Sequence, residues 1–396
     1  MNFPEQPDDA LSLVKIDTPS RASSLARPTL LCLSHLRWGF VYQRPQHVMS
    51  RLAKDYDVLF FEEPIFTDTP QPALDISQPA TGITVIVPRF AHGTSAAQAV
   101  EWQRELLDGY LAEHSGKDLL SAKELLLWYL TPMSLSFTEH LKARVTIFDC
   151  MDELSAFKGA PSDLLEKERQ LMDRADVVFT GGYSLWEAKK LQHGNAHPVP
   201  SSVDIAHFAA ARDRLPEPAD QAGIGFPRLG FFGVIDERFD IELASELASQ
   251  RPDWQVVLIG PVVKIDPDSL PRQPNIHYLG PKSYAELPLY LSGWDVALMP
   301  FAINESTRFI SPTKTPEYLA GGCPVVSTPI RDVISGYGNS GVVTIADSPQ
   351  AFIAGIEAAL ESRADVSFNQ RADAVLDGMS WDKTCALMKE QIECLR

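Results

Sequence analysis

Short runs of consecutive apolar residues alternate with segments of helical spacing along this chain, and this alternation constrains the fold more than any other feature. Thr29–Ser34 (TLLCLS) is typical of a buried strand, and Asp57–Phe61 (DVLFF) is typical of a second one. A polar loop, residues 35–47, and an amphipathic helix lie between them. This order predicts a βαβ unit of a parallel sheet. Because such sheets bind ligands beyond the carboxyl ends of their strands, we expect the 35–47 loop to lie at a binding site.

A second alternating set of strands and helices begins near residue 227. The chain of 396 residues is too long for one ordinary core, since domains usually contain roughly 150 residues. We therefore expect an α/β protein of two domains. The expected organisation is a loose leader over residues 1–27, a first domain over 28–208, a linker rich in Pro, Ala and charged residues over 209–226, a second domain over 227–378, and a C-terminal helix over 379–396.

Composition argues against several classes of partner. The net charge of −17 argues against nucleic acid and against an anionic membrane as the main partner. The five cysteines show no Cys-x-x-Cys spacing, which indicates reduced thiols. The first residues lack the basic and apolar regions of a secretory signal, and no apolar run approaches the ~20 residues that span a bilayer. We therefore expect a cytoplasmic protein without a transmembrane segment, and its transient contact with a membrane and its oligomeric state stay open.

The most informative stretch is residues 311–328, SPTKTPEYLAGGCPVVST, which reads as a loop, a short helix and a buried strand. Ser311 or Thr313 can cap the helix. A helix N-terminus favours an anion, and Lys314 adds a full positive charge there. Glu317 can accept hydrogen bonds from sugar hydroxyls. The stretch therefore predicts a diphosphate at the helix tip with a ribose beside it. The alternative is an amphipathic helix whose charged residues only make it soluble.

The order Lys, then Glu-Tyr-Leu-Ala-x-Gly, then Pro-Val-Val within this stretch resembles the donor-binding signature of GT-B glycosyltransferases of the group 1 (family 4) type. The resemblance covers nearly all of the chain from about residue 29. It implies two Rossmann-like domains with parallel sheets that face each other across a cleft, where a nucleotide-diphosphate sugar binds. It also implies that the C-terminal helix crosses back to the first domain.

The same resemblance implies a donor site built around the loop FGVIDERFD, residues 232–240. Gly233 lets backbone approach the donor, and the cations Arg238 and Lys314 would neutralise the leaving diphosphate, because no metal-binding motif is visible. From the residues alone, the loop is also compatible with a charged surface turn. The donor-binding residues implied in this way are Gly233, Arg238, Lys282, Arg308, Ser311, Thr313, Lys314 and Glu317.

On the acceptor side, QRPQH at residues 43–47 and DCMDE at residues 149–153 resemble a subgroup of bacterial polysaccharide glycosyltransferases. The acceptor-side residues implied are His35, Trp38, Arg44 and His47, for which the alternative is packing over the end of the sheet. Asp149 and Asp152 are the candidate general bases for an acceptor hydroxyl, and we favour Asp152. One of the two is expected to cap the following helix instead.

One position departs from the commonest retaining pattern of such enzymes. That pattern has a Glu eight residues before Glu317, where this chain has Phe309, and Glu305 is out of register. The donor-sugar contacts and the anomeric outcome therefore stay open. A group of inverting glucuronosyltransferases with the same frame uses an Asp of the N-terminal domain as base, and that alternative would make Asp152 or Asp149 essential.

We therefore predict a metal-independent hexosyltransferase. It would move a sugar from a nucleotide-diphosphate sugar, with UDP favoured, to a hydroxyl of a glycan or lipid-linked glycan in bacterial envelope polysaccharide synthesis. No cofactor is expected beyond the nucleotide sugar as co-substrate. The alternatives are a nucleotide-sugar epimerase of the same fold and a catalytically silent subunit that binds a sugar nucleotide.

Overall fold

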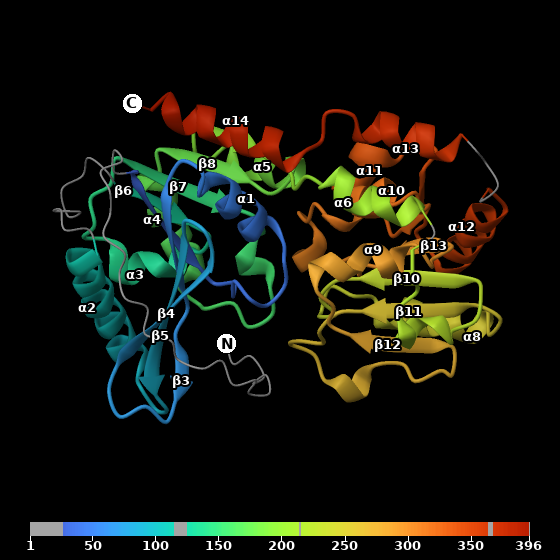
Figure 1. Ribbon diagram of the computed structural model, residues 1–396, viewed down its shortest axis with the longest axis horizontal. Coiled ribbons are helices and arrows are strands. Elements are labelled where there is room, and N and C mark those ends of the chain that lie inside the picture. Colours follow the sequence, from blue (N-terminus) through green and yellow to red (C-terminus); the bar gives the residue numbers. More distant parts are fainter. Residues whose placement is uncertain (1–26, 115–124, 214, 363–366, 396) are drawn as a thin grey trace.

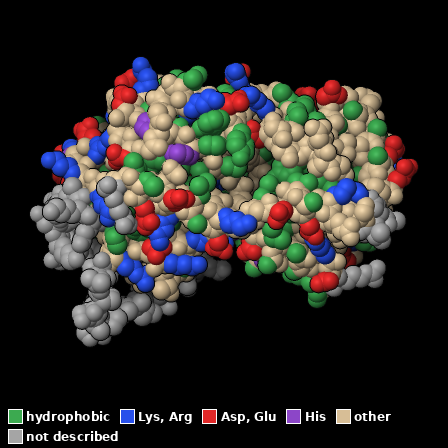
Figure 2. All heavy atoms as spheres, turned by 90° about the horizontal axis from the view of Figure 1, so that it is seen from above, with side chains coloured by type: hydrophobic (Ala, Val, Ile, Leu, Met, Phe, Trp, Pro, Cys, Tyr) green, Lys and Arg blue, Asp and Glu red, His purple; other side chains and the backbone are tan. Residues whose placement is uncertain are grey.

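Two α/β domains lie side by side and are joined along one edge (Figure 1). The computed structural model describes residues 27–114, 125–213, 215–362 and 367–395. The expected leader over residues 1–27 lies outside the described residues apart from Arg27. Seen from above, the surface is hollowed where the two domains meet, and hydrophobic side chains gather beside the hollow (Figure 2).

The first domain contains a sheet that is ordered β3-β5-β2-β1-β6-β7-β8-β9 in the described residues. β1 is central and pairs in parallel with β2 on one side and β6 on the other. The strands are β1 (Thr29–Ser34), β2 (Asp57–Glu62), β3 (Ile65–Thr67), β4 (Ala73–Ala80), β5 (Ile83–Ala91), β6 (Leu125–Tyr129), β7 (Val145–Cys150), β8 (Val177–Thr180) and β9 (Ala196–Pro198).

Two strands of this sheet were not predicted. β3 is only three residues long, and β4 pairs antiparallel with β5 at the edge of an otherwise parallel sheet. All eight residues of β4 are exposed or half-buried, so this strand has no buried apolar run. Strands are predicted from runs of apolar residues or from alternating apolar and polar residues. An exposed edge strand shows neither pattern in its sequence.

The second domain contains a parallel sheet ordered β12-β11-β10-β13-β14-β15. Its strands are β10 (Arg228–Phe232), β11 (Gln255–Ile259), β12 (Ile276–Gly280), β13 (Val296–Met299), β14 (Val325–Ser327) and β15 (Val343–Ile345). The expected α/β architecture with two sheets is confirmed. The strands β10, β11 and β13 are buried on both faces, which explains their largely apolar sequences.

Helices cover both faces of each sheet (Figure 1). They are α1 (Arg44–Leu52), α2 (Ala96–His114), α3 (Leu135–Thr138), α4 (Leu164–Arg174), α5 (Tyr183–Lys189), α6 (Ile205–Ala209), α7 (Ala219–Ala222), α8 (Ile241–Gln250), α9 (Leu287–Leu291), α10 (Lys314–Ala320), α11 (Arg331–Tyr337), α12 (Pro349–Glu361), α13 (Phe368–Leu376) and α14 (Trp381–Glu393).

The last helix, α14, returns from the second domain and lies along the top of the first (Figure 1). Its apolar side chains Trp381, Cys385, Met388 and Ile392 are buried in the core that also holds β1 and α1. A second contact between the domains is a hydrogen bond at 3.0 Å, which Asp332 of α11 accepts from the Ser184 N–H at the start of α5. The two domains are therefore in contact through several elements.

Candidate functional site

A cavity of about 320 Å³ lies between the carboxyl ends of the two sheets. Loops that follow β1 and β7 of the first domain form one wall, and loops that follow β10, β11 and β13 of the second form the other. The cavity brings together eight of the residues that the sequence singled out, which are His35, Arg44, Asp152, Gly233, Arg238, Ser311, Thr313 and Lys314. Residues expected to hold the donor and residues expected to hold the acceptor thus share one space.

The loop after β10 is fixed by two glycines. The Gly233 N–H donates to the Ile259 carbonyl at 2.9 Å, so it is not free for a phosphate. Both glycines have backbone angles that side chains rarely adopt, with φ of 157° at Gly233 and 145° at Gly260. A Cβ on Gly260 would stand 1.8 Å from the Gly233 carbonyl oxygen. The two glycines therefore allow the loops after β10 and β11 to pack closely against each other.

Arg238 lies on this loop and faces the cavity. Its guanidinium donates to Asp236, with Nη2 to Oδ2 at 2.7 Å and Nε to Oδ1 at 3.0 Å. It also lies over the ring of Phe157 in the first domain, 5.2 Å from the centroid. Asp236 is buried, so the pair holds the planar donor fork in one orientation at the cavity wall.

Lys314 and Glu317 form an ion pair at the start of α10, with Nζ to Oε2 at 2.8 Å. Ser311, Thr313 and Lys314 line the cavity, whereas Glu317 lies behind Lys314 and is only 4% exposed. Burial raises the pKa of the Glu317 carboxyl, and Lys314 partly counteracts this. Thr313 occupies the N-cap position, but its side chain makes no capping hydrogen bond.

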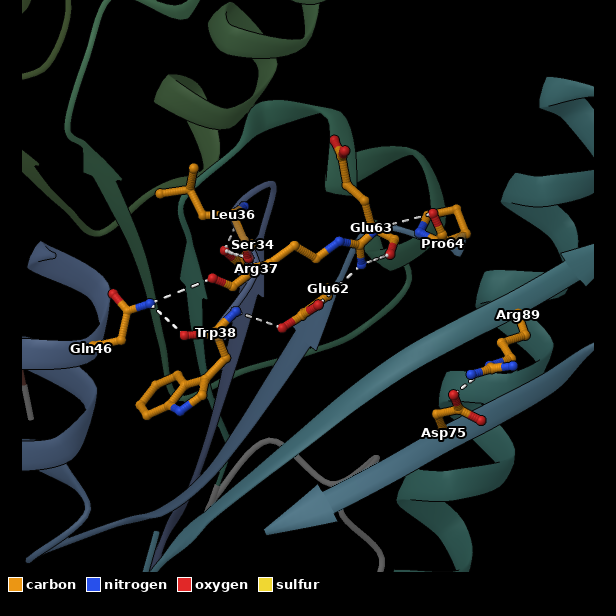
Figure 3. A network of polar contacts seen from close by, with 10 residues as sticks. All are labelled: Ser34, Leu36, Arg37, Trp38, Gln46, Glu62, Glu63, Pro64, Asp75 and Arg89. Carbon is orange, nitrogen blue, oxygen red and sulfur yellow. Dashed lines mark hydrogen bonds and ion pairs between the residues drawn. The ribbon is translucent and has the colours of Figure 1, made fainter. Parts of the chain in front are cut away.

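The loop after β1 is held by a polar network at the ends of β1 and β2 (Figure 3). Glu62 accepts hydrogen bonds from the Arg37 side chain at 3.0 Å and from the Trp38 N–H at 2.7 Å. Gln46 of α1 donates to the Trp38 carbonyl at 2.8 Å. The Trp38 ring packs edge-on against Phe60 and does not line the cavity. Trp38 therefore anchors the loop to the sheet, in agreement with the alternative that this residue packs over the end of the sheet.

Arg44 and Asp149 form a buried ion pair between α1 and the end of β7. Arg44 Nη2 and Asp149 Oδ1 are 2.7 Å apart, and the side chains are 4% and 1% exposed. Arg44 also donates to the Val199 carbonyl. Because its carboxylate is enclosed and already neutralised, Asp149 cannot reach an acceptor hydroxyl in this arrangement.

Asp152 is the carboxylate of the DCMDE segment that reaches the cavity. Burial raises the pKa of its carboxyl, and the nearby charge of Arg238 from the other domain acts in the opposite direction. Asp152 thus lies in a desolvated part of the cavity that also holds the cations Arg238 and Lys314 of the second domain.

His47 lies away from the cavity in an aromatic cluster at the junction of the domains. Its ring stacks on Trp381 of α14 at 4.5 Å and 9°, and meets Tyr42 and Tyr284 edge-on. Tyr284 in turn stacks on His207, at 4.4 Å and 12°. Burial, followed by the charge of Arg51, lowers the pKa of His47 to about 3. The cluster joins the first domain, α6, the second domain and α14.

The neutral state of His47 predicts a dependence of stability on pH. Its folded pKa is about 3 against an ordinary value of 6.5, so the unfolded chain binds more protons between these values. The free energy of unfolding should therefore fall as pH falls below about 6.5, by up to about 1.4 kcal/mol per pH unit. His47→Phe keeps a ring against Trp381 and cannot titrate. The free energy of unfolding, measured by urea denaturation from pH 6.5 to pH 5, should change less with pH in this variant than in the wild type. An equal change with pH in the two proteins would contradict the assignment to His47.

Two predicted donor residues lie elsewhere. Lys282 pairs with Asp220 at 2.6 Å and lies over the Tyr290 ring, outside the cavity lining. Arg308 has a side chain that is 64% exposed and lies 3.6 Å from Glu305. Phe309, where the retaining pattern has a glutamate, packs against the apolar core of the first domain. This position therefore serves the contact between the domains.

The cavity also contains residues that sequence reasoning missed. Lys264, from the loop after β11, lies over the Phe157 ring with Nζ 5.1 Å from the centroid. Glu63, directly after β2, lines the same cavity. Neither residue belongs to a recognisable motif. Both follow the carboxyl end of a strand, and this position is the sequence feature that could have indicated their place in the cavity. His35 does line the cavity, and burial, followed by the charge of Lys264, lowers its pKa to about 4.

Within the described residues, no cluster of three or more His, Cys, Asp or Glu side chains is arranged to hold a metal ion. No helix among those residues is long and apolar enough to cross a bilayer.

Comparisons with known proteins define the class to which this site belongs. Residues 227–362 match the family described as glycosyl transferases group 1. Solved structures with the same overall arrangement include sucrose-phosphate synthase of Thermosynechococcus elongatus, with a TM-score of 0.71 and 16% identity, covering 93% of this chain and 99% of that one. Anabaena Alr3699/HepE in complex with UDP has a TM-score of 0.62 and 13% identity, covering 92% and 100%. The predicted GT-B fold is confirmed, and residues 227–362 match a domain of group 1 glycosyl transferases.

A sequence relative narrows the comparison. TuaH of Bacillus subtilis (strain 168), which is assigned as a glycosyltransferase of teichuronic acid biosynthesis, is 27% identical over 279 residues. The aligned part covers 65% of this chain and 68% of TuaH.

Proposed function

We propose that this glycosyltransferase moves a hexosyl group from a UDP-sugar to a hydroxyl of a glycan or lipid-linked glycan during synthesis of a bacterial envelope polysaccharide. The observation that carries the proposal is the shared cavity, in which Asp152 of the first domain faces Arg238 and Lys314 of the second. The likeness to TuaH supports the polysaccharide role, and the UDP complex of HepE supports the donor.

The roles of the second domain follow from charge. Arg238 and Lys314 each keep a carboxylate partner, Asp236 and Glu317, so both side chains are ordered before a donor arrives. A diphosphate would draw the Lys314 ammonium forward, which frees the Glu317 carboxylate for the ribose hydroxyls. As the bond from the anomeric carbon to the diphosphate breaks, charge develops on the leaving oxygen, and the two cations stabilise it.

The role of the first domain is proton transfer. Asp152 would accept the proton of the acceptor hydroxyl. At the same time the hydroxyl oxygen of the acceptor would bond to the anomeric carbon of the donor, and UDP would leave. Such a single displacement inverts the anomeric centre. The apolar contact made by Phe309, in the place of a second glutamate, is consistent with a site that does not follow the retaining pattern.

The donor assignment is tested with Lys314→Gln, whose amide can still bond to the buried Glu317. A charge-assisted hydrogen bond is worth about 1.5–3 kcal/mol, so the Kd of UDP should rise about 10- to 100-fold in isothermal titration. Lys54→Gln, an exposed lysine after α1 that is remote from the cavity, should bind UDP like the wild type. Equal UDP affinity in Lys314→Gln and Lys54→Gln would remove Lys314 from the donor site.

A further inference from the structure

Lys264 has an unusual backbone conformation at the edge of the cavity. After β11 the chain stays paired with the loop after β10, because Ile235 donates to Pro261 at 3.0 Å and Val263 donates to Ile235 at 3.1 Å. Lys264 follows this pairing with a φ of 62°, and no other non-glycine among the described residues has a positive φ. Long side chains rarely adopt this region, and such residues concentrate at functional sites.

The side chain of Lys264 reaches across the cleft. Its Nζ lies 5.1 Å from the centroid of the Phe157 ring, which belongs to the first domain and follows the short turn Leu154–Ala156. Arg238 contacts the same ring. Lys264 therefore belongs to the second domain by sequence but presents its charge to the acceptor half of the cavity.

Lys264 also differs from the other basic residues of the cavity wall in having no carboxylate partner. Arg37, Arg44, Arg238 and Lys314 each pair with an acidic side chain, namely Glu62, Asp149, Asp236 and Glu317. Within the described part of the chain, no acidic group lies within ion-pair distance of Lys264. Among the described basic side chains of the cavity wall, its ammonium is thus the one that makes no direct ion pair and could form one with a bound anion.

The acidic groups near Lys264 indicate what this charge is for. Asp152 and Glu63 line the acceptor half, and the charge of Lys264 counteracts the rise that burial causes in the pKa of both carboxyls. These carboxylates would repel an anionic acceptor, and a cation placed beside them offsets that repulsion. A neutral acceptor would need no such cation.

We propose that Lys264 binds an anionic group of the acceptor, a phosphate or a carboxylate carried on the glycan or on its carrier. This inference rests on the proposed function, because it assumes that the first-domain half of the cavity receives the acceptor.

The test uses three small probes, glucose 1-phosphate, glucuronic acid and glucose, each titrated into the full-length protein with saturating UDP. The wild type should bind one of the two anionic probes at least tenfold more tightly than glucose, and the choice between them distinguishes phosphate from carboxylate. Lys264→Asn, which tolerates the left-handed backbone, should lose that preference while the Kd of UDP changes less than twofold. Lys54→Asn, an exposed control, should keep the preference.

Three outcomes would overturn the inference. Equal affinity of the wild type for all three probes would leave Lys264 without an anionic acceptor. A tenfold loss of UDP affinity in Lys264→Asn would assign the lysine to the donor instead. A wild-type protein that does not bind UDP at all would overturn the proposed function, and this inference with it. Normal UDP binding without a preference for an anionic probe would leave the proposed function standing and remove only the role of Lys264.

Discussion

Asp152→Asn should lower turnover by about 10²- to 10⁴-fold, the range that a positioned general base contributes, and should leave the Kd of UDP unchanged. The amide is nearly isosteric with the carboxylate, but it cannot accept the proton of an attacking hydroxyl. The Asp152 charge lies near Arg238 and would oppose rather than assist the binding of a diphosphate, so its removal should not weaken UDP binding. Turnover is measured as acceptor-dependent release of UDP, with UDP affinity determined separately by titration.

The pH profile gives a second readout of the same variant. The base must be deprotonated, and burial raises the pKa of Asp152 above its ordinary value of 3.8. Turnover of the wild type should therefore fall on the acidic side as Asp152 becomes protonated, and the variant should lack this limb. Glu63→Gln is the matched control, because Glu63 is another cavity carboxyl whose pKa is raised by burial. Turnover of Asp152→Asn within a few fold of the control would assign proton transfer to another group.

Arg44→Met should destabilise the protein by about 3–5 kcal/mol, because it leaves the buried Asp149 carboxylate without its counter-charge. Methionine occupies a similar volume but cannot donate to Asp149 or to the Val199 carbonyl. The free energy of unfolding is measured by urea denaturation, followed by a signal from the first domain.

The double variant Arg44→Met with Asp149→Leu separates charge from packing. Replacing both partners of a buried ion pair with apolar residues is often nearly neutral, so most of the lost stability should return. The Val199 carbonyl remains without the Arg44 donor, which leaves a residual cost. A double variant as unstable as the single one would show that packing around Arg44, rather than the stranded charge, sets the loss.

The cavity position of three predicted donor residues was readable from sequence because they lie in short segments at strand ends or at a helix start. Gly233, Arg238 and Lys314 lie where the predicted strand ends and helix start put them, and all three face the cavity. Most of the parallel strands were readable because they are apolar runs, whereas the three-residue β3 was not. The expectation that residues of the two domains lie close together required only the rule that ligands bind beyond the carboxyl ends of such strands.

The remaining assignments depended on long-range partners that no local pattern encodes. Asp149 is enclosed by Arg44, which is 105 residues away, and Lys282 is taken by Asp220, 62 residues away. Sequence spacing alone treated Asp149 and Asp152 as near equals, although one is buried in an ion pair and the other reaches the cavity. Lys264 was missed for a related reason, since it is distinguished by a backbone angle and by having no carboxylate partner among the residues that the structure describes.

The position of α14 has a consequence for how this protein is made. Arg51 pairs with Asp382 and Asp55 with Lys389, contacts that span 331 and 334 residues of sequence. At ~5–20 residues per second, a ribosome needs on the order of 20–70 s to add that much chain. The apolar surface that α14 covers beside α1 stays open throughout this interval, whereas the second domain takes its core from residues 203–376. The domain that is synthesised first is thus the last to complete its core, and chaperones would meet it in that unfinished state.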